Sequence, residues 1–330
     1  METKLFFGSI SFILAAITTA ITVPYIIKFG KKYNLVDEPD ERKHHRKSVV
    51  RIGGVAILFG LIIAMIFVCS LLRMFTDLDL SLDRPVITAL IICLIFFLIG
   101  LVDDLFSLSP FLRLGIQFLI TLFAWSQGLG IQLLDISPLG LNISEIFLPN
   151  FLSILLTCIW LVGVSNSINW MDGMDGLASG VCLIKTIGIV LISFSFDNSM
   201  IFFIAFSLAG SSLGFLIHNF YPSKIYMGDS GSYLYGSCIA ILSILTFTKY
   251  GGVSSHGLIS IEKSLLFVLI PISDMTFVIL KRLWKRKSPF FPDRSHLHHR
   301  ILNYGKNVPE TLLIIYGLVF GTTLLTFILY

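Results

Sequence analysis

The chain has 330 residues, of which 55% are hydrophobic and 13% charged, and its formal net charge is +4. A soluble domain carries about 25% charged residues, so this composition excludes that class. Apolar runs of about 20 residues recur along the chain and predict a polytopic helical membrane protein. The five cysteines form no C-x-x-C pair, which argues against a zinc site or a disulfide framework. No nucleic-acid partner is expected.

We expect an all-α fold with about ten membrane-spanning helices, forming a single domain over residues 1–330. The expected spans lie near 5–28, 53–73, 85–102, 111–127, 150–167, 177–195, 200–217, 231–248, 264–281 and 311–329. The first apolar run is too long for the core of a signal peptide, so we interpret it as a retained anchor.

Lysine and arginine concentrate in two connectors, at 31–51 and 281–306. Connectors rich in these residues face the cytoplasm. With ten spans, both connectors lie on the same side, and both termini are then expected outside. The connector at 127–150 contains no Lys, Arg or His. We expect it to be an outer spacer with a turn around Pro138.

Oxygen-bearing side chains recur in the stretch from Asn166 to Leu177, which lies between two apolar runs. Asn166, Asn169, Asp172 and Asp175 are spaced every third residue. On a helix such residues lie near one face, so the pattern predicts an oxygen-rich strip at the membrane surface. Carboxylates and amides suit a hard cation such as Mg²⁺. A water-facing helix cap is the alternative, but a cap needs only one such residue.

Two adjacent acids, Asp103 and Asp104, follow an apolar run at the expected end of a span. Acids at a helix C-terminus oppose the macrodipole, which disfavours an ordinary helix boundary. They could bind a metal, orient a nucleophile or pair with a basic loop.

The stretch Gly228–Ser232 is similar to the sequence around a serine-protease nucleophile, but no base is evident for Ser230. Asp229 at a helix entrance is a better candidate metal ligand. The amides that follow it could receive phosphate oxygens.

Three histidines occur close together in the last basic connector, at His296, His298 and His299, with Arg294 and Arg300 beside them. No cysteine accompanies them, and the spacing differs from H-E-x-x-H. The segment therefore indicates a phosphate-binding or acid-supplying loop. A connector that only sets orientation would need Lys and Arg, not three histidines.

Lys185 and Asp274 lie within or near apolar runs. An intramembrane charge is a functional candidate by default. For Lys185 we favour the alternative, in which its long side chain reaches the membrane interface. Across the chain, acids for a metal and cations for phosphates gather on one predicted face. This combination suggests phosphoryl transfer on a lipid.

These residues, in this order, resemble the polyprenyl-phosphate N-acetylhexosamine-1-phosphate transferase family, also called glycosyltransferase family 4. The matching segments are Gly53-Gly54, Asp103-Asp104 with Arg113 and Gln117, Asn166–Leu177, Asn219-x-x-Pro222, Met227–Ser232 and Pro292–Arg300. The first basic connector matches at Arg42, Lys43, His45 and Arg51, but Ser48 and Val50 replace two prolines of the related pattern.

The resemblance implies that a UDP-sugar gives its sugar-1-phosphate to undecaprenyl phosphate, that UMP leaves, and that Mg²⁺ is required, with Mn²⁺ as an alternative. It implies Asp229 as the metal ligand, assisted by Asn169 or Asp172, and Asp103 as a base on the lipid phosphate. A phosphate monoester is already mostly dianionic at neutral pH, so we expect Asp103 and Asp104 mainly to position metal and lipid. The implied catalytic residues are Asp103, Asp104, Asp172, Asp175, His296, His298 and His299. The implied substrate-binding residues are His45, Arg51, Asn166, Asn169, Asn219, Arg294 and Arg300.

Two branches of the family differ in the last connector. The peptidoglycan branch, which transfers phospho-N-acetylmuramoyl-pentapeptide, has three consecutive histidines followed by an acid, whereas here Leu297 interrupts the histidines and Arg300 follows them. We therefore predict transfer of N-acetylglucosamine-1-phosphate at the cytoplasmic face of the cell membrane. A transporter or flippase would need polar residues through the membrane depth. A homodimer is left open.

Overall fold

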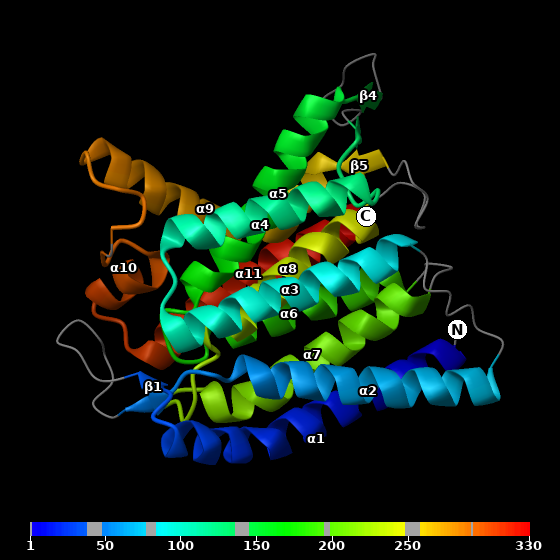
Figure 1. Cartoon of the computed structure of the whole chain (residues 1–330), viewed down its shortest axis with the longest axis horizontal. Coiled ribbons are helices and arrows are strands. Elements are labelled where there is room, and N and C mark those ends of the chain that lie inside the picture. Colours follow the sequence, from blue (N-terminus) through cyan, green and yellow to red (C-terminus); the bar gives the residue numbers. More distant parts are fainter. Residues whose placement is uncertain are drawn as a thin grey trace.

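The computed structural model describes residues 2–37, 48–76, 84–135, 145–194, 199–247, 258–291 and 293–330. In these ranges the chain forms ten long helices, one short helix and five short strands (Figure 1). The helices are α1 (Glu2–Lys32), α2 (Gly54–Phe75), α3 (Arg84–Phe106), α4 (Pro110–Ser126), α5 (Asn150–Met171), α6 (Leu177–Ser193), α7 (Ser199–Asn219), α8 (Gly228–Thr246), α9 (Ile261–Trp284), α10 (Leu297–Asn303) and α11 (Val308–Leu329).

Seven of the described helices are long and apolar enough to cross a membrane. They are α1, α2, α3, α5, α7, α9 and α11. The apolar helices α4 and α6 are shorter, with 17 residues each, and α8 has 19 residues. The all-α polytopic class is thus confirmed and each expected span corresponds to a helix. The number of membrane crossings, which we expect to be ten, stays a prediction.

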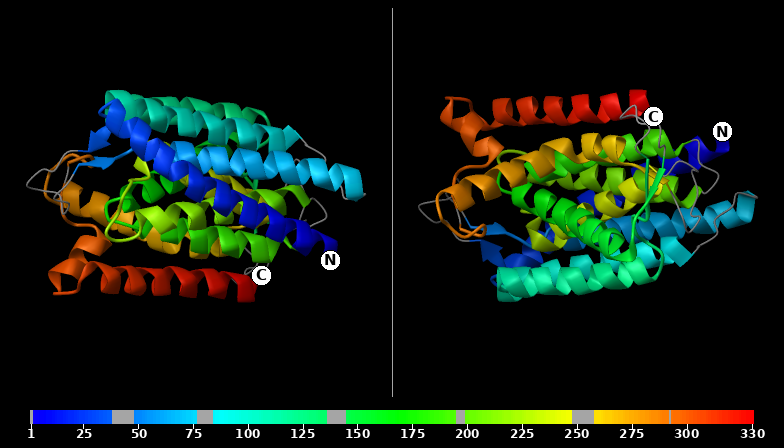
Figure 2. Two further views of the ribbon diagram at one scale, coloured as in Figure 1. Left: turned by 90° about the horizontal axis from the view of Figure 1, so that it is seen from below. Right: turned by 90° about the horizontal axis from the view of Figure 1, so that it is seen from above.

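Helix α8 is the centre of the bundle, and every residue from Ser230 to Thr246 is buried. It packs against α3 and α5 most extensively, with α2 and α6 also in contact (Figure 2). A helix that is covered on all sides must be apolar or small all round. Glycines permit the closest approaches, since Gly231 lies against Gly54 and Gly236 against Ser165.

Two small sheets lie at opposite ends of the bundle (Figure 1). One is the antiparallel pair of β1 (Val36–Asp37) and β2 (Val49–Val50). The other has the order β4-β3-β5, with β3 (Leu133–Asp135) antiparallel to β4 (Glu145–Phe147) and parallel to β5 (Leu258–Ser260).

The connector at 127–150 is therefore more than the spacer that we expected, because it supplies β3 and β4. Pro138, where a turn was expected, lies outside the described residues. The partner strand β5 comes from more than 100 residues later in the chain. Such a long-range pairing leaves no local pattern in the sequence.

Both termini lie at the end of the bundle that carries β4 and β5, opposite α10 and β1 (Figure 1). The polar clusters predicted from the sequence gather at the other end, around the start of α8.

Lys185 does not reach an interface, and this expectation was wrong. Lys185 belongs to α6, and its side chain is fully buried against α9 and α11. The Nζ atom donates a hydrogen bond of 2.8 Å to Thr323 Oγ1 and lies 4.7 Å from the centre of the Phe267 ring. Because α7 and α11 cover α6, the side chain is enclosed by protein.

Candidate active site

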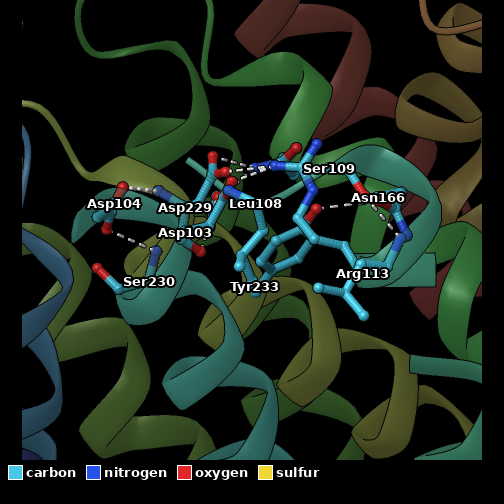
Figure 3. A network of polar contacts seen from close by, with 12 residues as sticks. Asp103, Asp104, Leu108, Ser109, Arg113, Asn166, Asp229, Ser230 and Tyr233 are labelled. Atoms are coloured by element: carbon cyan, nitrogen blue, oxygen red, sulfur yellow. Dashed lines mark hydrogen bonds and ion pairs between the residues drawn. The ribbon is translucent and has the colours of Figure 1, made fainter. Parts of the chain in front are cut away.

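The adjacent acids lie inside the last turn of α3, because this helix continues to Phe106. Asp104 is 4% exposed and faces the first turn of α8 (Figure 3). Its two carboxylate oxygens accept the backbone N–H groups of Asp229, at 2.8 Å, and Ser230, at 3.0 Å. A carboxylate at a helix N-terminus satisfies unpaired amides and favours the helix dipole. Asp104 therefore fixes the start of α8 and with it the position of Asp229.

Asp103 belongs to an ion-pair network with Arg113 of α4 (Figure 3). The Arg113 guanidinium pairs with Asp103 and, at 2.7 Å, with Asp229. The other oxygen of Asp103 accepts the Leu108 N–H at 2.6 Å. Both oxygens of Asp103 are thus engaged. The sequence left three roles open for these acids: metal binding, orientation of a nucleophile or pairing with a basic loop. The structure shows Asp103 paired with the cationic Arg113, which lies on helix α4 and not in a loop.

Helix α5 brings two amides to the same place. The Asn169 Nδ2 group donates to Asp229 Oδ1 at 2.8 Å and to Ser232 Oγ at 2.9 Å. One turn earlier, Asn166 donates to Gln117 at 2.7 Å and accepts the hydroxyl of Tyr233 at 3.2 Å. These contacts tie α4, α5 and α8 together around Asp229.

The oxygen-rich strip is helical only at Asn166 and Asn169, so the prediction of a four-residue strip on one helix was wrong. Helix α5 ends at Met171. Gly176, with a φ of 76°, adopts the left-handed conformation that favours glycine and precedes α6. Asp175, in the resulting turn, accepts both the backbone N–H and the hydroxyl of Ser223.

The half-buried Asp172 caps the end of α5. Removal from solvent, together with the charges of Asp229, Asp104 and Asp175, raises the pKa of Asp172 well above its ordinary value. Burial is the largest cause of this shift, and the three neighbouring carboxylates add to it. A bound cation would offset those charges.

The histidine segment, residues His296–His299, reaches this cluster from the connector at 281–306. A Cβ atom built on Gly173 would lie 3.0 Å from His298 Nε2, so His298 lies directly against the turn that follows Asp172. His298 stacks on His296 and contacts His299, with ring centres 5.8 and 4.2 Å apart. The three histidines and the Asp172–Asp175 turn thus form one surface.

Two further predicted substrate-binding residues, Asn219 and Arg300, have contacts that the structure describes. Asn219 is buried and holds a loop, because it donates to the Ile225 carbonyl at 2.9 Å and accepts the Ser179 hydroxyl at 2.6 Å. Arg300 is exposed and its guanidinium lies over Phe277. Their substrate contacts stay predictions.

Arg51 contributes its backbone carbonyl, which lies against Gly228, and its side chain is half-buried. Arg294 is exposed in the last connector. His45 lies outside the described residues. Substrate binding by these three residues stays a prediction.

The carboxylates of Asp229 and Asp172 suit a hard divalent cation, whereas Asn169 presents its Nδ2 group to Asp229, so its side chain would have to turn to offer its oxygen. Carboxylate and amide oxygens are the ligands that Mg²⁺ prefers, and Mg²⁺ is usually held by one or two carboxylates together with substrate phosphates and water. Among the described residues, no three His, Cys, Asp or Glu side chains form a complete metal site. The arrangement is therefore one in which Asp229, with Asn169 or Asp172, would share the ion with a phosphate ligand.

Comparison with known proteins places this geometry in a family. The family model of glycosyl transferase family 4 matches residues 86–247. A Bacillus subtilis protein named as a probable undecaprenyl-phosphate N-acetylglucosaminyl 1-phosphate transferase is 32% identical over 94% of this chain and 82% of its own. The decaprenyl-phosphate N-acetylglucosaminephosphotransferase of Mycobacterium leprae is 33% identical over 92% of this chain and 78% of its own. This chain belongs to glycosyl transferase family 4.

In this family-4 transferase, several site residues were not assigned a role from the sequence. Arg113 and Gln117 matched the family motif, but nothing in their local pattern showed that Arg113 meets Asp229. Ser232 belonged to a matching segment but received no role, and Tyr233, which follows it, was not singled out. The available signal was the resemblance itself, because Arg113 and Gln117 belong to the segment matched after the paired acids.

Replacing the bridging arginine tests the ion-pair network of this family-4 transferase. Arg113→Ala leaves Asp103 and Asp229 without their shared cation, and we expect kcat/KM to fall about 10²-fold because preorganised charge is lost. Arg113→Lys should recover only part of the rate, since an ammonium lacks the guanidinium fork. The measurement is transfer by purified protein.

Arg84→Ala is the matched control, because Arg84 is exposed and bonds to Gln127 at the opposite end of the bundle. Wild-type rates for Arg113→Ala would show that the network is only structural.

Proposed function

We propose that this protein transfers N-acetylglucosamine-1-phosphate from UDP-N-acetylglucosamine to undecaprenyl phosphate and releases UMP. The observation that carries the proposal is the convergence of Asp104, Arg113 and Asn169 on Asp229 at one end of an apolar helix bundle. The names of the relatives in Bacillus subtilis and Thermotoga maritima, which cite undecaprenyl phosphate and N-acetylglucosamine, support the choice of both substrates.

The reaction that we propose exchanges one phosphoanhydride bond, in the UDP-sugar, for another, in the lipid-linked product. An oxygen of the lipid phosphate attacks the phosphorus bonded to the sugar, and a new P–O bond forms. The bond from that phosphorus to the bridging oxygen breaks, and its electron pair leaves with UMP. Such transfer depends mostly on positioning and charge neutralisation.

Asp103 has a positioning role in this scheme. Its two oxygens are occupied by Arg113 and the Leu108 amide, so it holds the guanidinium in place. No base is needed on the lipid phosphate, because a phosphate monoester with a second pKa of about 6 is mostly dianionic at neutral pH.

Mg²⁺, with Mn²⁺ as an alternative, would be held by Asp229 with Asn169 or Asp172. When bound, the ion would neutralise charge on the pyrophosphate. Asp172 and Asp175 would lie beside the nucleotide. The histidine segment, with His296, His298 and His299, would meet the phosphates.

We also propose that this end of the bundle faces the cytoplasm and that both termini lie outside. The support is the excess of Lys and Arg in the connectors at 31–51 and 281–306.

The choice of sugar is tested with purified enzyme, undecaprenyl phosphate and either UDP-N-acetylglucosamine or UDP-N-acetylmuramoyl-pentapeptide. We expect faster formation of the N-acetylglucosamine lipid, because Leu297 interrupts the histidines and Arg300 follows them in a compact basic loop. The products are separated and quantified as radiolabelled lipids. A faster rate with the pentapeptide donor would refute the branch assignment, while absence of transfer from every UDP-sugar would refute the function.

A further inference from the structure

A third buried carboxylate, besides Asp103 and Asp104, lies on α9, outside the acid cluster. Asp274 is 7% exposed. One of its oxygens lies 2.9 Å from His296 Nδ1, and the other accepts the Leu297 N–H at 2.7 Å. Eight residues later on the same helix, Arg282 pairs with Asp293 at 2.9 Å. Helix α9 thus holds the histidine segment at two points, one acidic and one basic.

The contact with Asp274 determines which ring nitrogen of His296 carries a proton. An ionised carboxylate can only accept hydrogen bonds, so Nδ1 must be the donor. The hydrogen bond at one nitrogen sets the state of the other, and Nε2 is left as the nitrogen that can meet a ligand. The Trp170 ring of α5 stands edge-on to His296 at 5.8 Å, and His298 stacks on its face. These three neighbours fix the ring in position and in plane.

His296 is linked to the active site through its contact with His298. His298 stacks on His296 and lies against Gly173, in the turn between Asp172 and Asp175. The ring stack therefore connects Asp274 to the surface that we assign to the nucleotide and its phosphates. A rotation of His296 would move His298 along that surface.

We propose that Asp274 is a positioning residue, which holds His296 with its proton on Nδ1 and so sets how the histidine segment meets the phosphates of the sugar nucleotide. This inference rests on the proposed function. Asp274 itself acts through His296 and does not touch the reacting atoms.

Asp274→Asn is the most informative variant, because the asparagine side chain has nearly the same size and shape as that of aspartate. Its amide oxygen can still accept the Leu297 N–H, while its amide NH₂ faces His296 Nδ1 and favours the opposite tautomer. We expect kcat with UDP-N-acetylglucosamine to fall about 10- to 100-fold. The KM for undecaprenyl phosphate and the thermal stability in detergent should stay within twofold and about 2 °C of the wild type. Ser273→Ala, at an exposed neighbouring position on α9, is the matched control.

A double variant separates positioning from a general structural role. In the background of His296→Ala, Asp274→Asn should cost less than about twofold, because the group through which it acts is already missing. Spectra of protein labelled with ¹⁵N-histidine supply a readout that does not depend on turnover. One ring, identified by its absence in His296→Ala, should change from the Nδ1–H to the Nε2–H form.

The outcomes distinguish the two proposals. If the wild type transfers the sugar phosphate and Asp274→Asn keeps its rate, positioning by Asp274 is overturned and the function stands. The inference would also be overturned if the losses of kcat in Asp274→Asn and His296→Ala multiplied in the double variant. A fall in the thermal stability of Asp274→Asn that accompanied its loss of kcat would overturn it as well. A wild type that transfers from no UDP-sugar would overturn the function and, with it, this inference.

Discussion

Asp229→Asn is expected to lower turnover by about 10²–10³-fold while the protein stays folded and inserted. Asp229 receives Arg113 and Asn169 on its side chain, and its backbone amide is fixed by Asp104. Removing its charge takes away the carboxylate that we assign to the metal. Loss of one such preorganised group costs about 2.7–4 kcal/mol of transition-state stabilisation. Turnover is measured with UDP-N-acetylglucosamine and undecaprenyl phosphate over a range of Mg²⁺ concentrations.

The dependence on Mg²⁺ identifies the role of the lost charge. The variant should need a higher Mg²⁺ concentration for half-maximal rate, and a chelator should abolish the wild-type activity reversibly. Glu310→Gln is the control, because this exposed acid caps α11 away from the cluster. Near-normal turnover of Asp229→Asn at low Mg²⁺ would eliminate Asp229 as the metal ligand.

Gly100→Ala is expected to disrupt the site through packing alone. A Cβ atom at Gly100 would lie 2.2 Å from the backbone oxygen of Asp229 and 2.5 Å from the nitrogen of Ser230. Backbone cannot rotate away as a side chain can, so α3 and α8 must separate. Overpacking of this kind costs about 1–3 kcal/mol, occasionally more. Separation also withdraws Asp104 from the start of α8, and we expect activity to fall at least about 10²-fold.

The matched variant is Gly163→Ala on α5, where an added Cβ meets nothing within 4 Å. Alanine forms helix better than glycine by about 1 kcal/mol, so this change should leave stability equal or slightly higher. The two variants are compared by their melting temperatures in detergent and by turnover. Equal behaviour of the two would show that the close contact of α3 with α8 is not needed.

The residues of the site were largely predictable, whereas their contacts were not. Asp103, Asp104, Asn169 and Asp229 stand out in the sequence because polar groups are costly beside apolar spans. Their pairing depends on how three helices approach one another, which glycines such as Gly100 permit. Local spacing could not show this, since an interval of three residues also fits a chain that leaves the helix after Met171.

The partner of Asp274 was likewise not predictable from the sequence. Its position in an apolar run marked it as a functional candidate, but its partner His296 is 22 residues away in a connector. Likewise, the long side chain of Lys185 suggested that it reaches the interface, whereas packing by α11 encloses it. In both cases the charge was visible in the sequence and its partner was supplied by tertiary structure.

The burial of Lys185 has a consequence for the biogenesis of the protein. Its partner Thr323 is synthesised 138 residues later, which takes about 10–30 s at ordinary elongation rates. During that interval α6 carries a lysine near its centre, a residue that costs about 2.5–3.5 kcal/mol on a membrane-insertion scale. The hydrogen bond and the ring contact that offset this cost can form only once α9 and α11 are in place. Helix α11 thus completes the surroundings of a lysine that was synthesised 138 residues earlier.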